Sequence, residues 1–427
     1  MIHAAGSNAS KVSQSPGHGS FFANRFIRSI LLSAVFLQLG IWIRNFAILL
    51  FVTEQTDKDP IAISLISVAE YAPIFIFSFI GGAFADRWRP KRTMVICDLL
   101  SAVSVFVVLL ALIYGGWQSI FFATLVSSIL SQFSQPAGMK LFKLHVPASQ
   151  IQMGMSMYQT IQAVFMILGP MLGSLVFFRF GIQTAVVIMG ICFVLSAAVL
   201  TTLPKDGIVQ RKEPTRLSAD IKSGLHYVLG NKIFLYMASF FIAAGLALGI
   251  MNPLGIYVVT EHLGLDADQL QWFTAMNGAG MILGGMLVMG LSKRMPPRIM
   301  LIIGFTFSSA AVAVIGTTTT TGVALAAQFA AGLLVPFIHI ACQTLMMSHA
   351  EEAYVGRVSG IMSPLFTGGM VLTMSIVGVL KANLPLTVLY GIAAALFFVG
   401  AIGVLPLLRH KQPVNAHGAA HAGGFHH

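Results

Sequence analysis

Long apolar runs recur along the whole chain and limit its possible folds more than any other feature of the sequence. A helix needs about 20 apolar residues to cross a bilayer, and it satisfies its backbone hydrogen bonds within itself. With 56% hydrophobic and 9% charged residues, the chain has too few charges to cover a soluble globule. The sequence therefore predicts an all-α integral membrane protein with twelve transmembrane helices. The predicted spans are 26–52, 61–85, 93–114, 119–137, 155–178, 183–203, 234–259, 270–291, 298–316, 322–345, 359–380 and 386–407.

The basic residues are distributed unevenly between the loops. Of the 25 Lys and Arg residues, 21 lie in the two tails, in the loops after spans 2, 4, 6, 8 and 10, or in the first turn of a span that follows one of them. The opposite loops hold Lys58, Arg179 and Lys381. Because basic loops stay on the cytoplasmic side, both termini are expected in the cytoplasm. The net charge of +11 follows from this asymmetry, so no nucleic-acid partner is expected.

A long basic connection separates six spans from six. The expected parts are a disordered cytoplasmic tail at 1–24, an N-terminal six-helix bundle at 25–203, a cytoplasmic linker with an amphipathic helix at 204–231, a C-terminal six-helix bundle at 232–407 and a disordered His-containing tail at 408–427. RPKRTM at 89–94 aligns with MPPRIM at 295–300, which indicates that the two bundles are pseudo-symmetric. Repeated halves are typical of transporters that bind substrate between them.

A cluster of charge lies between spans 2 and 3, in the stretch GGAFADRWRPKRTM. Gly82, Asp86, Arg87 and Lys91 resemble the G-x-x-x-D-R-x-G-R-K loop of the major facilitator superfamily. That resemblance implies a charge cluster that latches a cytoplasmic gate against the start of span 11. The expected gate residues are Gly82, Asp86, Arg87, Lys91, Arg92, Asp98, Gly356 and Arg357. The alternative interpretation is that these charges only flank the membrane.

Two further patches resemble the same superfamily. Gly169, Pro170 and Gly173 in GPMLG are similar to its antiporter motif, although ordinary small-residue packing would use the same residues. Gly356, Arg357 and the following Val resemble the macrolide-efflux and siderophore-exporter branch. The resemblance implies a bacterial drug:proton antiporter with the major facilitator fold, located in the cell membrane.

The sequence gives no indication of an enzyme. It has no Gly-Lys dipeptide and hence no phosphate-binding loop of the Walker type, and it has neither HExxH nor GxSxG. We expect no catalytic residues, no cofactor and no metal site.

Uncharged polar residues inside the spans are candidates for a substrate cavity. They are Gln38, Trp42, Asn45, Tyr71, Gln159, Gln162, Asn252 and Asn277. Each alone can be a hydrogen bond between helices. As a set they favour a roomy, aromatic and neutral-polar cavity that suits amphiphilic molecules.

Two charged residues, Arg44 and Glu70, lie inside predicted spans 1 and 2. At 1.5 Å per residue, both are expected about 12 to 14 Å from the external helix ends, on neighbouring helices. One interpretation is a permanent ion pair that holds the two spans together. The other is that Glu70 exchanges protons under the influence of Arg44, since ions are costly within a membrane and mark functional sites there.

The expected function is secondary active transport that exports amphiphilic, drug-like molecules by proton antiport with alternating access. The expected partners are the substrate, protons and the lipid bilayer, and the protein is expected to be a monomer. A siderophore or metallophore exporter and a lysophospholipid transporter are alternatives with the same fold. A membrane receptor or scaffold that transports nothing is disfavoured, because it has little reason to retain buried ions.

The charge asymmetry makes a topology prediction. Reporters fused after Asp57 and after Lys381 should report an external location, and fusions within 206–215 an internal one, because basic loops remain in the cytoplasm. Paired alkaline phosphatase and green fluorescent protein fusions measure this. An external linker would contradict the number of spans.

Overall fold

The computed structural model describes residues 25–146, 148–203, 217–291, 294–351 and 354–409. Within these ranges, the side chains of 78–87, 136, 139, 142–145, 148–152, 217–221, 355–356 and 409 are outside the description. The predicted N-terminal tail, most of the predicted C-terminal tail and the first part of the predicted linker also lie outside the described residues.

The described part of the chain is built from helices. The α-helices are α1 Arg25–Gln55, α2 Pro60–Arg87, α3 Pro90–Ile113, α4 Ser119–His145, α5 Ala148–Thr201, α6 Leu217–Gly230, α7 Lys232–Tyr257, α8 Leu270–Leu291, α9 Pro297–Thr317, α10 Thr321–His349, α11 Val355–Asn383 and α12 Leu386–Arg409. A π-helical turn, η2 Val258–His262, extends α7, and a 3-10 turn, η3 Ala267–Gln269, precedes α8.

Within the described ranges, ten helical stretches are long and apolar enough to cross a membrane. One of them, Met153–Thr201, is broken at Gly181, where φ is 76°. Glycine adopts this backbone conformation without strain because it has no Cβ, so α5 holds predicted spans 5 and 6 with only a glycine kink between them. The helix α4 occupies the fourth predicted span, although it is not among the ten stretches. The prediction of twelve transmembrane helices therefore fits the structure.

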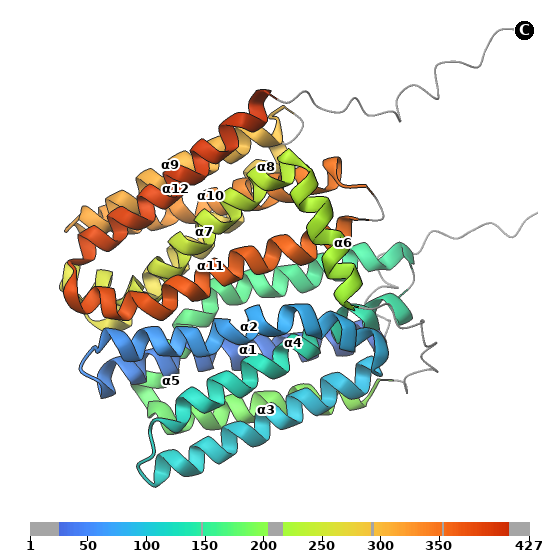
Figure 1. The fold of residues 1–427 in the computed structure, drawn as a ribbon. Helices are drawn as coiled ribbons and strands as arrows, with labels where there is room; N and C mark the ends of the chain where they lie inside the picture. The colour runs from blue at the N-terminus through green and yellow to red at the C-terminus, as the bar shows by residue number, and fades with distance from the viewer. Residues whose placement is uncertain (1–24, 147, 204–216, 292–293, 352–353, 410–427) are drawn as a thin grey trace, which may run out of the picture.

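The helices form two bundles, as predicted. In the first, α1 packs against α5, and α3 packs against α4 and α5; in the second, α7 packs against α11 and α12, and α9 packs against α10 and α12. Figure 1 shows α1–α5 in the lower part and α7–α12 in the upper part. The bundles meet where α2 packs against α11 and where α5 packs against α8.

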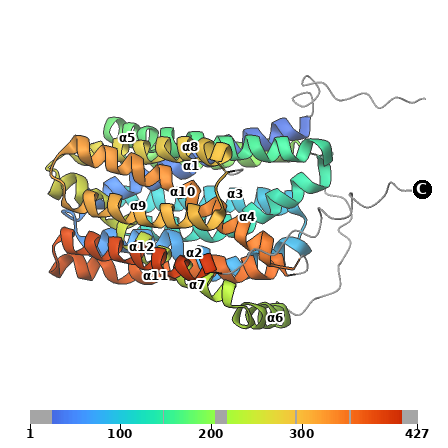
Figure 2. The same cartoon turned by 90° about the horizontal axis from the view of Figure 1, so that it is seen from above.

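The helix α6 lies at one end of the bundles, as both views show (Figures 1 and 2). It contacts α11 and α7, so it is attached to the second bundle. Val228 is buried in this contact, whereas Leu225 and Leu229 on the other face are exposed. We call this end of the molecule the α6 end. The opposite end, where Lys58 lies between α1 and α2, is the Lys58 end.

Two glycines allow α1 and α5 to approach closely. A Cβ added at Gly169 would lie 2.4 Å from Cγ of Trp42, and one added at Gly173 would lie 2.6 Å from Cβ of Phe46. Helix axes come this near only where one side has no side chain. Pro170 lies between the two glycines, within α5, and is buried. The GPMLG segment of α5 therefore fixes the position of α1, the helix that carries Arg44.

A Gly173→Ala substitution should destabilise the protein by about 1 to 3 kcal/mol, because the added methyl group must displace the backbone or Phe46. A Gly391→Ala substitution in α12 is the control, since a Cβ there meets no atom within 4 Å. Thermal unfolding of the two purified variants compares them. Equal stability would contradict the close contact.

Candidate functional site

Arg44 is a buried cation of the first bundle, with a relative exposure of 5%. Its Nη1 donates a hydrogen bond of 2.6 Å to Oγ of Ser127 on α4, and its Nε donates one of 2.9 Å to Oδ1 of Asn45. Two of its donor groups are thus satisfied by neutral oxygens from two helices. Arg44 lies eleven residues before the end of α1 at Gln55, about 16 Å along the helix.

Asn45 connects Arg44 to Glu70. Its Nδ2 donates a hydrogen bond of 2.6 Å to Oε1 of Glu70 on α2. Among the described contacts there is no direct hydrogen bond or ion pair between Arg44 and Glu70, so the permanent ion pair considered from the sequence is replaced by a bridge through an amide. We call Ser127, Arg44, Asn45 and Glu70 the polar chain. It links α4, α1 and α2, three helices of one bundle.

A contact between the bundles lies beside the polar chain. Tyr71 follows Glu70 on α2, and its hydroxyl is 3.5 Å from Nδ2 of Asn252 on α7. The Asn252 side chain is exposed, and Tyr71 is partly exposed. The structure therefore brings three of the predicted cavity residues, Asn45, Tyr71 and Asn252, into one region with Glu70.

The other predicted cavity residues are placed differently. The Trp42 ring covers Gly169 at the α1–α5 crossing. Asn277 donates to the backbone oxygen of Gln328 at 3.3 Å, which ties α8 to α10. Gln38 and Gln162 are partly exposed, and Gln159 is exposed. Trp42 and Asn277 therefore have packing partners inside their own bundle.

The predicted gate residues are only partly within the described residues. The structure does not describe the side-chain positions of Asp86 and Arg87 or the surroundings of Gly82 and Gly356. The gate latch therefore remains a prediction. Lys91 donates through Nζ to the backbone oxygens of Thr201, at 2.8 Å, and of Leu203. An ammonium group at this position satisfies carbonyls that the end of α5 leaves unpaired. Arg92 is exposed.

From the sequence, Asp98 is expected to pair with Arg87 or Arg92 in the gate cluster, but its described hydrogen-bond partner is a serine. Its Oδ2 accepts a hydrogen bond of 2.6 Å from Oγ of Ser196, and Ser196 is 2.9 Å from Oγ of Ser33. Since the single hydroxyl hydrogen of Ser196 goes to Asp98, Ser33 donates to Ser196. All three side chains are buried. Among the described side chains, Asp98 therefore joins α3, α5 and α1 through hydroxyl groups instead of pairing with Arg92.

Arg357 lies where α6 contacts α11. Its Cζ is 5.1 Å from the ring centroid of Tyr354, and that ring stacks on Tyr227 of α6 with centroids 4.3 Å apart. A Cβ on Gly224 would lie 3.0 Å from Cβ of Arg357. The tyrosine pair and the cation over it hold α6 against the start of α11. The sequence had indicated the amphipathic helix but not this contact.

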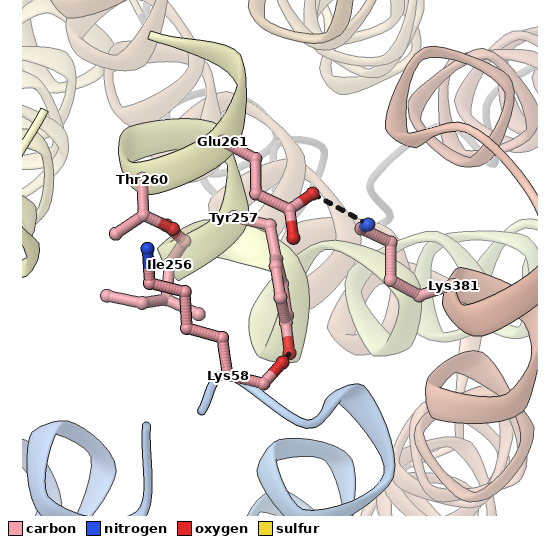
Figure 3. A network of polar contacts seen from close by, with 6 residues as sticks. All are labelled: Lys58, Ile256, Tyr257, Thr260, Glu261 and Lys381. Carbon is pink, nitrogen blue, oxygen red and sulfur yellow. Dashed lines mark hydrogen bonds and ion pairs between the residues drawn. The ribbon is translucent and has the colours of Figure 1, made fainter. Parts of the chain in front are cut away.

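The Lys58 end has a set of contacts that the sequence did not indicate (Figure 3). The Tyr257 hydroxyl on α7 donates a hydrogen bond of 2.7 Å to the backbone oxygen of Lys58. Lys381 on α11 pairs with Glu261 on η2 at 2.7 Å and lies 4.9 Å from the Tyr257 ring centroid. We call Lys58, Tyr257, Glu261 and Lys381 the Lys58 clamp. It connects the two bundles, because Lys58 belongs to the first and the other three residues to the second.

The backbone at Lys58 is held in an unusual conformation. Asp57 and Lys58 have φ values of 47° and 63°, in the left-handed region that most side chains avoid. Such conformations persist where surrounding contacts over-determine them. The Tyr257 hydrogen bond is one such contact. A π-helical turn, which is frequent at functional sites, begins directly after Tyr257.

A cavity of about 550 Å³ lies at the Lys58 end, between α1, α5 and α8. Its charged lining residues are Glu54, Arg179, Asp266 and Asp268. Glu54 is ten residues beyond Arg44 along α1, about 15 Å, so the cavity is separate from the polar chain. Within the described residues, no group of three or more His, Cys, Asp or Glu side chains is arranged to hold a metal ion.

Two six-helix bundles with buried polar groups near their boundary define a membrane transporter of the two-bundle class. Residues 30–260 and 240–425 match the family model of the Major Facilitator Superfamily. The chain belongs to this superfamily. It is a multi-pass membrane transporter with bacterial relatives.

Curated relatives cover most of the chain. The multidrug efflux pump Tap of Mycolicibacterium fortuitum is 27% identical, covering 83% of this chain and 90% of that protein. Macrolide efflux protein A of Streptococcus pyogenes is 23% identical, covering 78% of this chain and 84% of that protein. Among solved structures, the nucleoside transporter NupG is 16% identical with a TM-score of 0.72 and covers 91% of this chain and 100% of that chain. The likeness to NupG concerns the fold alone.

A Tyr257→Phe substitution should weaken the Lys58 clamp, because it removes the hydrogen bond to Lys58 and keeps the ring beneath Lys381. The loss of about 0.5 to 1.5 kcal/mol should increase the population in which the Lys58 end is open. Spin labels at Glu54→Cys and Asp266→Cys, one in each bundle, measure this population by pulsed electron resonance. Tyr390→Phe, at another fully buried tyrosine, is the control. Identical distance distributions in both variants would contradict the role of the clamp.

Proposed function

We propose that this protein exports amphiphilic small molecules by proton antiport, with Glu70 as the proton-exchanging group and Arg44 as the cation that acts on it. The exporter alternates between two states in which either the Lys58 end or the α6 end is open.

The observation that carries this proposal is the polar chain. A charge at the centre of a membrane-spanning helix costs about 2.5 to 3.5 kcal/mol on insertion scales, so such groups mark ion pathways more often than structural contacts. Arg44 is neutralised by no direct ion pair among its described contacts, and Glu70 remains partly exposed. A carboxyl group that is reachable and held by one hydrogen bond can take and release a proton.

The substrate would bind beside Glu70, where Tyr71 and Asn252 meet between the bundles. Both side chains combine limited polarity with access from the space between the halves. An aromatic ring and a neutral amide recognise amphiphilic molecules without requiring a fixed charge. The names of the efflux relatives, Tap and macrolide efflux protein A, support export of drug-like molecules.

The basic α6 end is proposed to face the cytoplasm. Lys91, Arg92, Lys222 and Arg357 all lie at this end, as the positive-inside rule requires. The Lys58 end is then external, and the Lys58 clamp closes it in the conformation described here.

A Glu70→Gln substitution should abolish uphill export, because the amide cannot carry the exchanged proton. Downhill movement of substrate should continue, and its dependence on pH should be lost. Ethidium and erythromycin are suitable amphiphilic probes in proteoliposomes with an imposed pH gradient.

The matched control is Glu54→Gln, which removes a carboxylate from the exposed end of the same helix that carries Arg44. It should transport like the unmodified protein. If Glu70→Gln still accumulates either probe against its gradient, Glu70 is not the coupling group. If the unmodified protein moves neither probe, the proposed substrate class is wrong.

A further inference from the structure

Asn45 is the residue through which Arg44 and Glu70 are connected. Its side chain accepts from Nε of Arg44 at 2.9 Å and donates to Oε1 of Glu70 at 2.6 Å. The amide thus bridges a cation and a carboxyl group that do not contact each other directly. It sits between α1 and α2 at the depth of both charged groups.

The chemistry of Arg44 fixes the orientation of this amide. A guanidinium Nε–H can donate but cannot accept, so the Asn45 atom that faces it must be the oxygen. The amide nitrogen then faces Glu70. Ser127 holds the other side of the guanidinium at 2.6 Å, which prevents Arg44 from turning away. The amide therefore cannot rotate by half a turn unless Arg44 leaves its place.

This orientation restricts where Glu70 can hold a proton. Oε1 faces an N–H donor, and a proton on the same side of that oxygen would meet the amide hydrogens. The other carboxyl oxygen, Oε2, is not engaged by Asn45. A hydrogen bond that donates to the ionised carboxylate also favours the ionised form.

We infer that Asn45 is a positioning residue for proton exchange. It connects Glu70 to the cationic Arg44 through two hydrogen bonds, favours release of the proton from Glu70, and directs the proton to Oε2. The inference rests on the proposed role of Glu70. Proton uptake forms one O–H bond at Oε2, and proton release breaks that bond. No group is oxidised or reduced.

Few other titratable groups act on Glu70. The cation is Arg44 of α1, and Tyr71 is its neighbour on α2. The helix α4 contributes the neutral Ser127 to the polar chain, and α7 contributes the neutral Asn252 to Tyr71. On α11, Arg357 and Lys381 lie near the two ends of the helix, whereas Gly368, near its middle, contacts Phe75 of α2. Asn45 is thus the neutral residue that hydrogen-bonds directly to the carboxyl group of Glu70.

The test is an infrared difference titration of the full-length protein in lipid nanodiscs, with no substrate added. The C=O stretching band of a protonated carboxylic acid that disappears in Glu70→Gln reports Glu70. Asn45→Leu removes the hydrogen bond, and Asn45→Asp keeps the size of the side chain and the contact with Arg44 but replaces the donor by an oxygen. Asn277→Leu is the matched control, because it removes an amide that ties two helices of the other bundle.

In both Asn45 variants the half-point of the Glu70 titration should move to an about tenfold lower proton concentration, because a hydrogen bond to a charged group is worth about 1.5 to 3 kcal/mol. The Glu70 band should also change frequency. Asn277→Leu should change neither. If Asn45→Leu does not fold, Asn45→Ala replaces it, because Asn45→Asp also adds a carboxyl group beside Glu70 and would shift its titration by repulsion alone.

The outcomes separate the two hypotheses. A Glu70 band that titrates in the unmodified protein and is unchanged in both Asn45 variants would overturn the role of Asn45 and leave the proposed function intact. The absence of any titrating Glu70 band would overturn the proton-coupling proposal and this inference together. A shift of equal size in Asn277→Leu would show a general structural effect and would also overturn the inference.

Discussion

The guanidinium of Arg44 is the group on which the arrangement of the first bundle depends. A cation placed within apolar helices must find oxygen acceptors on its neighbours, because lipid offers none. Ser127 and Asn45 supply them, and Asn45 carries the connection on to Glu70. The close α1–α5 crossing at Gly169 and Gly173 fixes the helix that presents Arg44. Packing and electrostatics in this bundle therefore constrain the same helix from two sides.

Much of the fold could be predicted because a membrane imposes a strong pattern on sequence. Apolar runs gave the spans, and depth along neighbouring helices placed Arg44 and Glu70 close to each other. What depth does not determine is the direction in which a side chain points. Successive residues on a helix differ by about 100° around its axis, so whether Arg44 meets Glu70 directly or through Asn45 depends on packing that spacing alone does not encode.

Contacts between distant segments were the least predictable. The sequence identifies Lys58 and Lys381 only as loop charges, and it gives no signal for Tyr257 or Glu261. Their meeting depends on how α7 and α11 are placed against the α1–α2 turn. The serines of α4 and α5 were missed for a related reason, since a single hydroxyl in an apolar run has no periodic pattern. An ion within a span is a useful signal that such hydroxyls will be recruited nearby.

The attachment of α6 has a mechanical consequence for the proposed alternation between two states. Contacts among Tyr227, Tyr354 and Arg357 fix α6 to the second bundle. Any movement of that bundle therefore moves α6 with it. Leu217–Gly230 therefore belongs mechanically to the second bundle and does not act as a free joint between the bundles. A ligand or protein that binds α6 would therefore act on the second bundle without contacting the polar chain.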